Sequence, residues 1–253
     1  MLNLYDTYII GGANSAIAVD TISRIIPYIK RLILLYHNNR DLLDNMLKNF
    51  NKNELPQIDF ISADITNYQE LSDKFSDINI TTNFAGCYYS TIRSYDHKSL
   101  YETDLFVTKD IIDTNLFGAI HFLKLLLKFS RKVQQSNYVL LGSNISKNGL
   151  KNGSIYAATK AAVSNLTKSV AQEEGVNNVL INTVSPGPVE TNNSSFSPDY
   201  KAFRQNYFND KREKTALHRL AQPKDISELI IFLTSLNNKH ITGEEIFITG
   251  GEL

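Results

Sequence analysis

The sequence predicts an α/β fold in which helices cover both faces of one doubly wound parallel sheet of about seven strands. Three observations support this prediction. Short apolar runs alternate with longer segments of helical periodicity along the chain, as is typical of right-handed βαβ units. A turn of small residues follows the first apolar run. The 253 residues, 42% of them apolar, are enough for one sizeable core and few for two, so we expect a single domain over residues 1–253.

The strands and helices follow from the spacing of the apolar residues. Short apolar runs bounded by polar or turn residues predict the strands, at Tyr5–Ile10, Arg31–Tyr36, Gln57–Ser62, Ile80–Phe84, Asn137–Leu141, Leu180–Val184 and Glu245–Ile248. A helical period of apolar residues predicts the main helices, at Ala16–Ile29, from Asp41, at Lys109–Lys132 and at Ile155–Glu174. Parallel strands need cover on both faces, which favours a Rossmann-type sheet. The least regular segment, Glu190–Thr215, is predicted to be a lid.

The composition excludes several classes of function. Lys plus Arg and Asp plus Glu both number 26, so we expect neither nucleic-acid binding nor a polybasic membrane anchor. The single cysteine, Cys87, cannot form an internal disulfide and is predicted to be a packed thiol. The first residues lack the layout of a signal peptide, and no apolar run approaches the roughly 20 residues that cross a bilayer. We therefore expect a cytoplasmic protein whose partners are small molecules or copies of itself.

The turn after the first strand is a candidate phosphate site. Residues Gly11–Ala18 read GGANSAIA and lie between an apolar strand and a helical pattern. In this context small residues can lay a pyrophosphate on the amides of a helix N-terminus. A tight strand-to-helix turn that binds no dinucleotide fits the turn equally well when it is considered alone.

A second group of residues has the chemistry of a proton donor. Tyr156 and Lys160 are four residues apart on a predicted helix and therefore share one face. Ser143 ends the preceding apolar strand, and Asn115 lies inside the long helix before it. A ketone that accepts hydride becomes an alkoxide and needs a proton. A neighbouring cation such as Lys160 lowers the pKa of a phenol and makes it a better donor near neutral pH.

These residues, in this order and spacing, give the chain a resemblance to the short-chain dehydrogenase/reductase family, and most closely to the 3-oxoacyl carrier-protein reductases. The resemblance implies an oxidoreductase that moves hydride between a nicotinamide cofactor and a ketone or secondary alcohol. It implies that Asn115, Ser143, Tyr156 and Lys160 are catalytic, and it implies no metal. The chain has Ala16 and Ala18 where the family has glycine, and we expect the methyl group of Ala16 to crowd the phosphates.

The resemblance also implies the cofactor contacts. Asp64 matches an acid that binds the adenine amino group, the segment Asn83–Gly86 matches a turn that passes the adenosine ribose, and Pro186–Thr191 matches a segment around the nicotinamide carboxamide. The complete predicted set is Gly12, Asn14, Ser15, Ile17, His37, Asn38, Arg40, Asp64, Ile65, Asn83, Ala85, Gly86, Tyr156, Lys160, Pro186, Gly187, Val189 and Thr191.

The end of the second strand predicts NADP(H) in preference to NAD(H). A carboxylate there would repel a 2′-phosphate, but the stretch 36–40 contains no acid. His37, Asn38 and Arg40 can donate to a phosphate, and Arg40 offers bidentate geometry. The alternative is that Arg40 is only a solvated residue at a helix start.

The substrate stays open because the segments Tyr88–Thr108 and Asn192–Thr215, which set it in the family, identify no ligand. A 3-oxoacyl thioester, a sugar and a secondary-metabolite carbonyl are all candidates. An acidic carrier needs a basic docking surface; Arg131 and Lys132 supply part of it, but Gln172–Asn178 is acidic to neutral.

A different class of function, a non-catalytic dinucleotide-binding regulatory or partner protein, is opposed by the intact pair of Tyr156 and Lys160. The last helix and strand resemble those that commonly form a tetramer interface in the family, so we expect a homo-oligomer, either a dimer or a tetramer.

Overall fold

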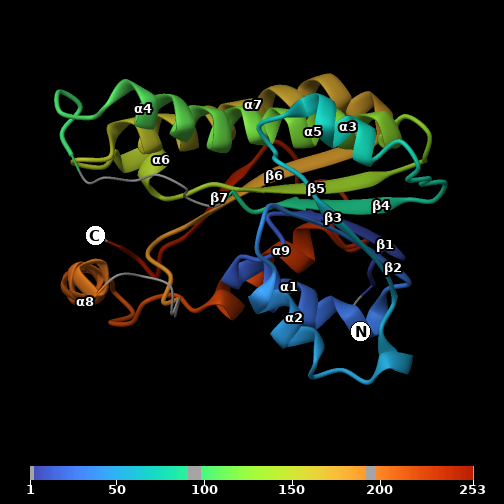
Figure 1. Ribbon diagram of the computed structural model, residues 1–253, viewed down its shortest axis with the longest axis horizontal. Coiled ribbons are helices and arrows are strands. Elements are labelled where there is room, and N and C mark those ends of the chain that lie inside the picture. The colour runs from blue at the N-terminus through green and yellow to red at the C-terminus, as the bar shows by residue number, and fades with distance from the viewer. Residues whose placement is uncertain (1–2, 91–97, 192–197, 253) are drawn as a thin grey trace.

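A computed structural model, which describes residues 3–90, 98–191 and 198–252, contains a seven-stranded sheet of parallel strands in the order β3-β2-β1-β4-β5-β6-β7 (Figure 1). The order reverses direction between β1 and β4, so the predicted doubly wound sheet is confirmed. The strands are β1 (Thr7–Gly11), β2 (Arg31–Tyr36), β3 (Gln57–Ser62), β4 (Phe84–Tyr88), β5 (Ser136–Leu141), β6 (Val179–Pro186) and β7 (Glu245–Ile248).

Helices cover both faces of the sheet, as Figure 1 shows. One face carries α1 (Ala16–Ile25), α2 (Asp41–Leu47) and α9 (Pro223–Leu233), and the other carries α3 (Tyr68–Lys74), α4 (Leu105–Ile112), α5 (Gly118–Ser130) and α7 (Ser154–Glu174). The remaining helical segments are α6 (Ile145–Asn148), α8 (Pro198–Glu213) and short 3-10 turns at Ile26–Tyr28, Lys52–Glu54 and Gly175–Asn177. Among the described helices, none combines the length and the apolar character that a membrane span requires.

The sheet separates two apolar cores because successive strand residues point to opposite faces. On β1, Tyr8 and Ile10 pack into the core under α1 and α9, while Ile9 packs into the core under α5 and α7. Cys87 on β4 belongs to the first core, and burial raises the pKa of its thiol to about 12. Cys87 is therefore a packed thiol in this structure, as the sequence predicts.

The fourth strand lies later in the chain than the sequence predicts. The predicted strand Ile80–Phe84 is wrong, because β4 begins at Phe84 and pairs Ile9 with Gly86 and Gly11 with Tyr88. All five residues of β4 are buried, whereas Thr81 and Thr82 are exposed. The sheet therefore takes the five-residue stretch that buries completely in preference to the stretch before it, whose central residues 81–83 are polar.

The predicted continuous helix Lys109–Lys132 is divided in two. A π turn at Asp113–Phe117 separates α4 from α5, and α5 ends at Ser130. Single π turns inside helices are frequent at functional sites. This one buries Thr114 and Asn115, and it packs against α7.

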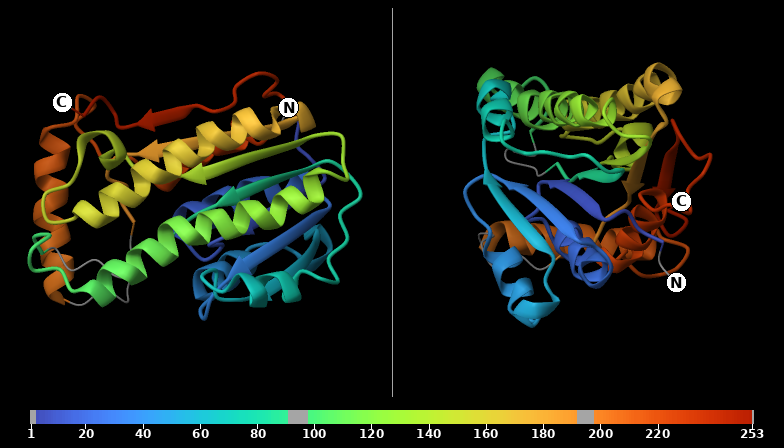
Figure 2. Two further views of the ribbon diagram at one scale, coloured as in Figure 1. Left: turned by 90° about the horizontal axis from the view of Figure 1, so that it is seen from above. Right: turned by 90° about the vertical axis from the view of Figure 1, so that its right-hand side faces the viewer.

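Helix α8 lies across the end of the sheet toward which the strand arrows point (Figure 2, left). Part of the predicted lid Glu190–Thr215 is thus a helix, and residues 192–197 of that prediction lie outside the described residues. Because the carboxyl ends of parallel strands are where α/β folds bind ligands, α8 borders the expected site.

Candidate active site

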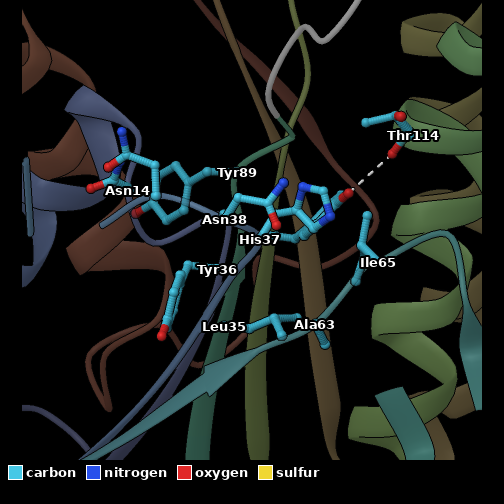
Figure 3. Close-up of a pocket in the computed structure, with 12 residues that line it drawn as sticks. Asn14, Leu35, Tyr36, His37, Asn38, Ala63, Ile65, Tyr89 and Thr114 are labelled. Atoms are coloured by element: carbon cyan, nitrogen blue, oxygen red, sulfur yellow. Dashed lines mark hydrogen bonds between the residues drawn. The ribbon is translucent and has the colours of Figure 1, made fainter. Parts of the chain in front are cut away.

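A cavity of about 300 Å³ opens at the carboxyl ends of β1, β2, β3 and β4, beside the point where the strand order reverses (Figure 3). This is the position at which open α/β sheets bind nucleotides. The cavity is lined by Gly12, Asn14, Leu35, Tyr36, His37, Asn38, Asn39, Ala63, Ile65, Tyr88, Tyr89 and Thr114. Five of these are among the predicted cofactor contacts, namely Gly12, Asn14, His37, Asn38 and Ile65, and their contact with a cofactor stays a prediction.

The small-residue turn brings backbone close to backbone at the mouth of this cavity. Gly12 has a φ of +69°, and a Cβ placed on it would lie 1.9 Å from the carbonyl oxygen of Tyr89. Ser15 then caps α1, because its Oγ accepts a hydrogen bond from the amide of Ala18 at 3.2 Å. Ile17 and Ala18 both point into the core beneath α1, so any contact of Ile17 with a cofactor would involve its backbone.

Residues after β2 form one wall of the cavity. The amide oxygen of Asn14 accepts from the backbone N–H of Leu43 at 3.1 Å, which ties the glycine turn to α2. His37 and Asn38 line the cavity, and so does Asn39, which the sequence reasoning missed. Asn39 directly follows two predicted contacts on the same loop, and this position was the available signal.

Arg40 lies outside the cavity lining. Its guanidinium is 4.5 Å above the ring of Phe60, and its Nε donates to Asp44 at 3.0 Å. The structure therefore brings His37 and Asn38 together at the cavity but holds Arg40 against β3 and α2. This position fits the alternative interpretation, in which Arg40 is a residue at the start of a helix.

Asp64 stabilises the turn after β3. Its Oδ1 accepts from the amide and the hydroxyl of Thr66, each at 2.9 Å, and its Oδ2 lies 3.7 Å from His37 Nε2. Asp64 is not part of the cavity lining, although its neighbour Ile65 is. Its predicted contact with adenine stays a prediction.

The predicted ribose turn requires a correction. Asn83 lies at the amino end of β4, where its side chain accepts from the backbone amides of Gln134 and Gln135 at 3.0 and 2.9 Å. Ala85 and Gly86 are buried within the strand. Because β4 begins four residues later than the predicted strand, these three residues lie too far back along it to reach a ligand at the carboxyl ends.

Tyr88, Tyr89 and Ser90 occupy the carboxyl end of β4 instead. The Tyr88 hydroxyl donates to the carbonyl of Thr114 in the π turn at 3.1 Å (Figure 3). The Tyr89 hydroxyl donates to Thr21 on α1 at 2.8 Å. The apolar run that continues through Cys87 to Tyr89 was the signal that could have located this end of the strand.

The predicted proton-transfer pair lies on α7. Lys160 is 1% exposed, and its Nζ donates to the carbonyl of Leu141 at 2.8 Å and to the hydroxyl of Ser90. The same Nζ lies 5.7 Å from the centroid of the Tyr156 ring. Burial lowers the pKa of Lys160 to about 7, because a low-dielectric environment disfavours the charged amine.

The π turn leaves two buried oxygen atoms without a partner among the described residues, Thr114 Oγ1 and Asn115 Oδ1. Buried polar atoms are almost always hydrogen-bonded in proteins, so each such atom can accept a hydrogen bond from a water or a ligand. Thr114 lines the cavity, and Asn115 comes from the same turn, which packs against α7. The sequence reasoning missed Thr114.

Ser143 follows β5 and is half-buried. Its hydroxyl is 3.4 Å from the amide oxygen of Asn144, and the amide nitrogen of Asn144 donates to Glu252. Glu252 also pairs with Lys211 on α8. Burial alone would lower the pKa of Lys211. The hydrogen bond from Lys211 to Glu252 outweighs this effect, together with nearby negative charge, so the pKa of Lys211 is raised above its usual value. This link between α8 and the Ser143 loop has no local sequence signal.

The segment after β6 lies at the same edge of the sheet. Pro186 ends the strand, and the amide of Gly187 donates to the carbonyl of Ile248 at 2.9 Å. Val189 forms an isolated bridge with Ala221. With Thr191, these are the predicted nicotinamide contacts, and β6, β7 and the segment before α9 hold them in place.

Proteins similar to this chain in sequence are reductases and dehydrogenases. The family model described as Enoyl-(Acyl carrier protein) reductase matches residues 15–252. The chain is 29% identical over 181 residues to a 3-oxoacyl-[acyl-carrier-protein] reductase of Vibrio cholerae, covering 72% of this chain and 69% of that protein. It is 28% identical over 197 residues to an L-fucose dehydrogenase of Oryctolagus cuniculus, covering 76% and 67%.

The fold has close counterparts among solved structures. A 3-oxoacyl-[acyl-carrier protein] reductase from Brucella melitensis with bound NAD superposes with a TM-score of 0.80 at 20% sequence identity, covering 97% of this chain and 90% of that one. At this identity the likeness concerns the arrangement of the sheet and its helices.

Proposed function

This chain belongs to the short-chain dehydrogenase/reductase family and is a nicotinamide-dependent oxidoreductase of alcohol and carbonyl groups, and on that premise we propose that Tyr156 exchanges the proton with a small-molecule ketone or secondary alcohol. The observation that carries the proposal is the buried amine of Lys160, which lies 5.7 Å from the Tyr156 ring. A structural lysine would have its amine in water.

The residues divide the chemistry among them. When bound, the nicotinamide supplies or accepts the hydride. Tyr156 donates its phenolic proton to the oxygen that becomes an alkoxide, and Ser143 donates a hydrogen bond to the same oxygen as charge develops. Protonated Lys160 stabilises the phenolate that remains. Because the pKa of Lys160 is about 7, the charged form predominates below neutral pH and is lost as the pH rises.

The residues present fit a dinucleotide. The turn at Gly12 brings its backbone against that of Tyr89 without a side chain between them, at the mouth of the cavity. Thr114 lines the cavity, and its buried hydroxyl oxygen has no partner among the described residues. We propose that Gly12, Asn14, Ser15, Ile17 and the wall at 37–39 hold the adenosine half. The segment Pro186–Thr191, with Tyr156 and Lys160, would hold the nicotinamide half.

We propose NADP(H) as the preferred cofactor, because the stretch 36–40 contains no acid to repel a 2′-phosphate. Titration of the protein with each reduced cofactor, followed by nicotinamide fluorescence, is expected to give tighter binding of NADPH. In this proposal the Arg40 side chain turns from Asp44 to the 2′-phosphate, so Arg40→Ala should weaken NADPH binding by about tenfold, the loss of one modest charge-assisted contact, and leave NADH binding unchanged.

The matched control for that titration is Arg24→Ala, since Arg24 lies on α1 and pairs with Asp20. Equal affinity of the parent protein for the two cofactors would refute the preference. Tight NADPH binding that Arg40→Ala does not alter would place the phosphate contact on His37 or Asn38 instead.

We propose that the substrate is a free small molecule, such as a sugar or secondary-metabolite carbonyl or an acyl thioester, and is not presented by an acidic carrier. Arg131, part of the predicted docking surface, donates to Glu174 at 2.7 Å. The pairing neutralises the charge that an acidic carrier would need.

A 3-oxoacyl group should therefore be reduced with about equal kcat/KM on a carrier and on a short pantetheine thioester, because no docking energy separates the two. Steady-state kinetics with both substrates measures this. A carrier substrate preferred by tenfold or more would show that the surface docks a carrier. The variant Glu174→Gln, which releases Arg131, is the informative comparison.

The second candidate function is a dinucleotide-binding partner protein without turnover. Ala16 in place of the family's glycine is the observation that favours it. Cofactor binding without oxidation of NADPH across a ketone panel would support it.

A cytoplasmic location and a homo-oligomer stay part of our proposal. Exposed apolar side chains on α4 and the π turn support self-association, namely Leu105, Phe106 and Phe117.

A further inference from the structure

Ser90 lies directly after β4, and its hydroxyl oxygen accepts a hydrogen bond from Lys160 Nζ. The contact joins residues 70 positions apart in the chain. The half-buried side chain of Ser90 meets the amine of a lysine that is 1% exposed. The second acceptor of this amine is the backbone carbonyl of Leu141 on β5. A substitution at position 141 would keep that carbonyl, so Ser90 is the acceptor that a side-chain change can remove.

A buried ammonium group depends on such acceptors. It has three N–H donors and no acceptor, and burial removes the water that would otherwise accept from them. Here a hydroxyl and a carbonyl, both neutral dipoles, replace that water. Each one favours the charged form of the amine over the neutral form.

The titratable groups on the elements around Lys160 are few within the described part of the chain. Tyr156 on α7 presents its ring to Nζ. Three others are engaged elsewhere. The Tyr88 hydroxyl donates to Thr114, Tyr138 on β5 bonds Ser130, and Asp113 in the π turn pairs with Lys109. Burial lowers the pKa of Lys160, and the groups that oppose this effect are the dipolar acceptors of its amine.

We propose that Ser90 is a positioning residue for Lys160, whose hydroxyl keeps the amine charged and holds it beside Tyr156. The inference rests on the proposed function, because it assigns Ser90 a role only through the pair of Tyr156 and Lys160. It extends that function to the residue that directly follows β4.

The direct test is the titration of Lys160 by NMR in protein labelled with ¹³C at lysine Cε, with the signal assigned from Lys160→Met. In Ser90→Ala the pKa of Lys160 should fall by about one unit, the usual size of a lost hydrogen bond to a charged group. Ser90→Thr, which retains the hydroxyl, should restore the parent value. An unchanged pKa in Ser90→Ala would overturn the proposal.

The pH dependence of kcat/KM provides a second test of the charge on Lys160. The alkaline limb of kcat/KM for ketone reduction should move to lower pH in Ser90→Ala by the same amount, because uncharged Lys160 no longer makes Tyr156 a good acid. At pH values well below 7 the variant should approach the parent. A uniform loss at every pH, with no movement of the limb, would indicate a merely structural role and overturn the proposal.

Two controls separate the possible failures. Ser23→Ala removes a serine hydroxyl on α1 that donates to the carbonyl of Asp20 at 2.8 Å, away from Lys160, and it should leave both measurements unchanged. If the parent protein turns over no ketone, the proposed proton transfer fails, yet the NMR titration still tests Ser90. If Ser90→Ala is poorly folded, Ser90→Gly removes the same hydroxyl with less bulk, and its titration decides.

Discussion

The substitution Tyr156→Phe is expected to lower kcat for ketone reduction by about 10²- to 10⁴-fold, the usual contribution of a positioned general acid. Phenylalanine keeps the ring that lies 5.7 Å from Lys160 Nζ and removes only the proton donor. The nicotinamide half of the cofactor keeps its other predicted contacts, so the Kd for NADPH should change by less than about threefold, or well under 1.4 kcal/mol. Steady-state kinetics and a fluorescence titration measure the two quantities.

The matched control is Tyr28→Phe, because the Tyr28 side chain is 54% exposed, in the 3-10 turn after α1. It should leave both kcat and Kd at parental values. If Tyr156→Phe turned over within tenfold of the parent, the phenol would not be the proton donor. If both proteins bound NADPH and neither oxidised it, the chain would be a binding protein.

The substitution Gly12→Ala is expected to abolish measurable cofactor binding and to lower the free energy of unfolding. The new Cβ would lie 1.9 Å from the carbonyl oxygen of Tyr89, and the backbone at position 12 has a φ of +69°. A left-handed φ by itself costs an L-residue about 1–3 kcal/mol, and the contact forces β1 and β4 apart at the mouth of the cavity. Chemical denaturation and the fluorescence titration measure the two effects.

Substitutions at two other glycines separate the effect of the left-handed φ from the effect of the steric contact. Gly149 has a φ of +71° with nothing near its absent side chain, and Gly175 has neither a positive φ nor a neighbour within 4 Å. Gly149→Ala should lose stability and retain cofactor binding, while Gly175→Ala should retain both. Cofactor binding by Gly12→Ala at the parental affinity would place the pyrophosphate away from this turn.

Much of the sheet could be predicted because burial of a parallel strand leaves a local pattern. The runs at 31–36, 57–62 and 245–248 are strands with the predicted bounds. The fourth strand could not be located from its neighbours, because Gly86 and Cys87 weaken the apolar signal of Phe84–Tyr88, and Ile80, Thr81 and Thr82 just before it are β-branched residues that favour a strand as well. Tertiary pairing with β1 decides the register.

Within the candidate site, too, the local contacts could be predicted from the sequence and the long-range contacts could not. Tyr156 and Lys160 share a helix face, so their spacing is visible in the sequence. The contact of Lys160 with Ser90 and that of Asn144 with Glu252 join residues 70 and 108 positions apart. No local pattern reports such contacts. The π turn likewise has no sequence signal that distinguishes it from the helices on either side.

The packing of α1 against α9 implies an order of events during synthesis. Tyr8 on β1 donates to the carbonyl of Thr234, across 226 residues of chain, and Asp20 on α1 accepts from Ser227 on α9. Contacts this distant in sequence form late, because closing the loop costs entropy before any contact rewards it. Until α9 has been synthesised, α1 lacks the helix beside it on the same face of the sheet, and the first apolar core lacks the residues that α9 contributes. The glycine turn, which leads directly into α1, therefore depends on support from a helix that is synthesised much later in the chain.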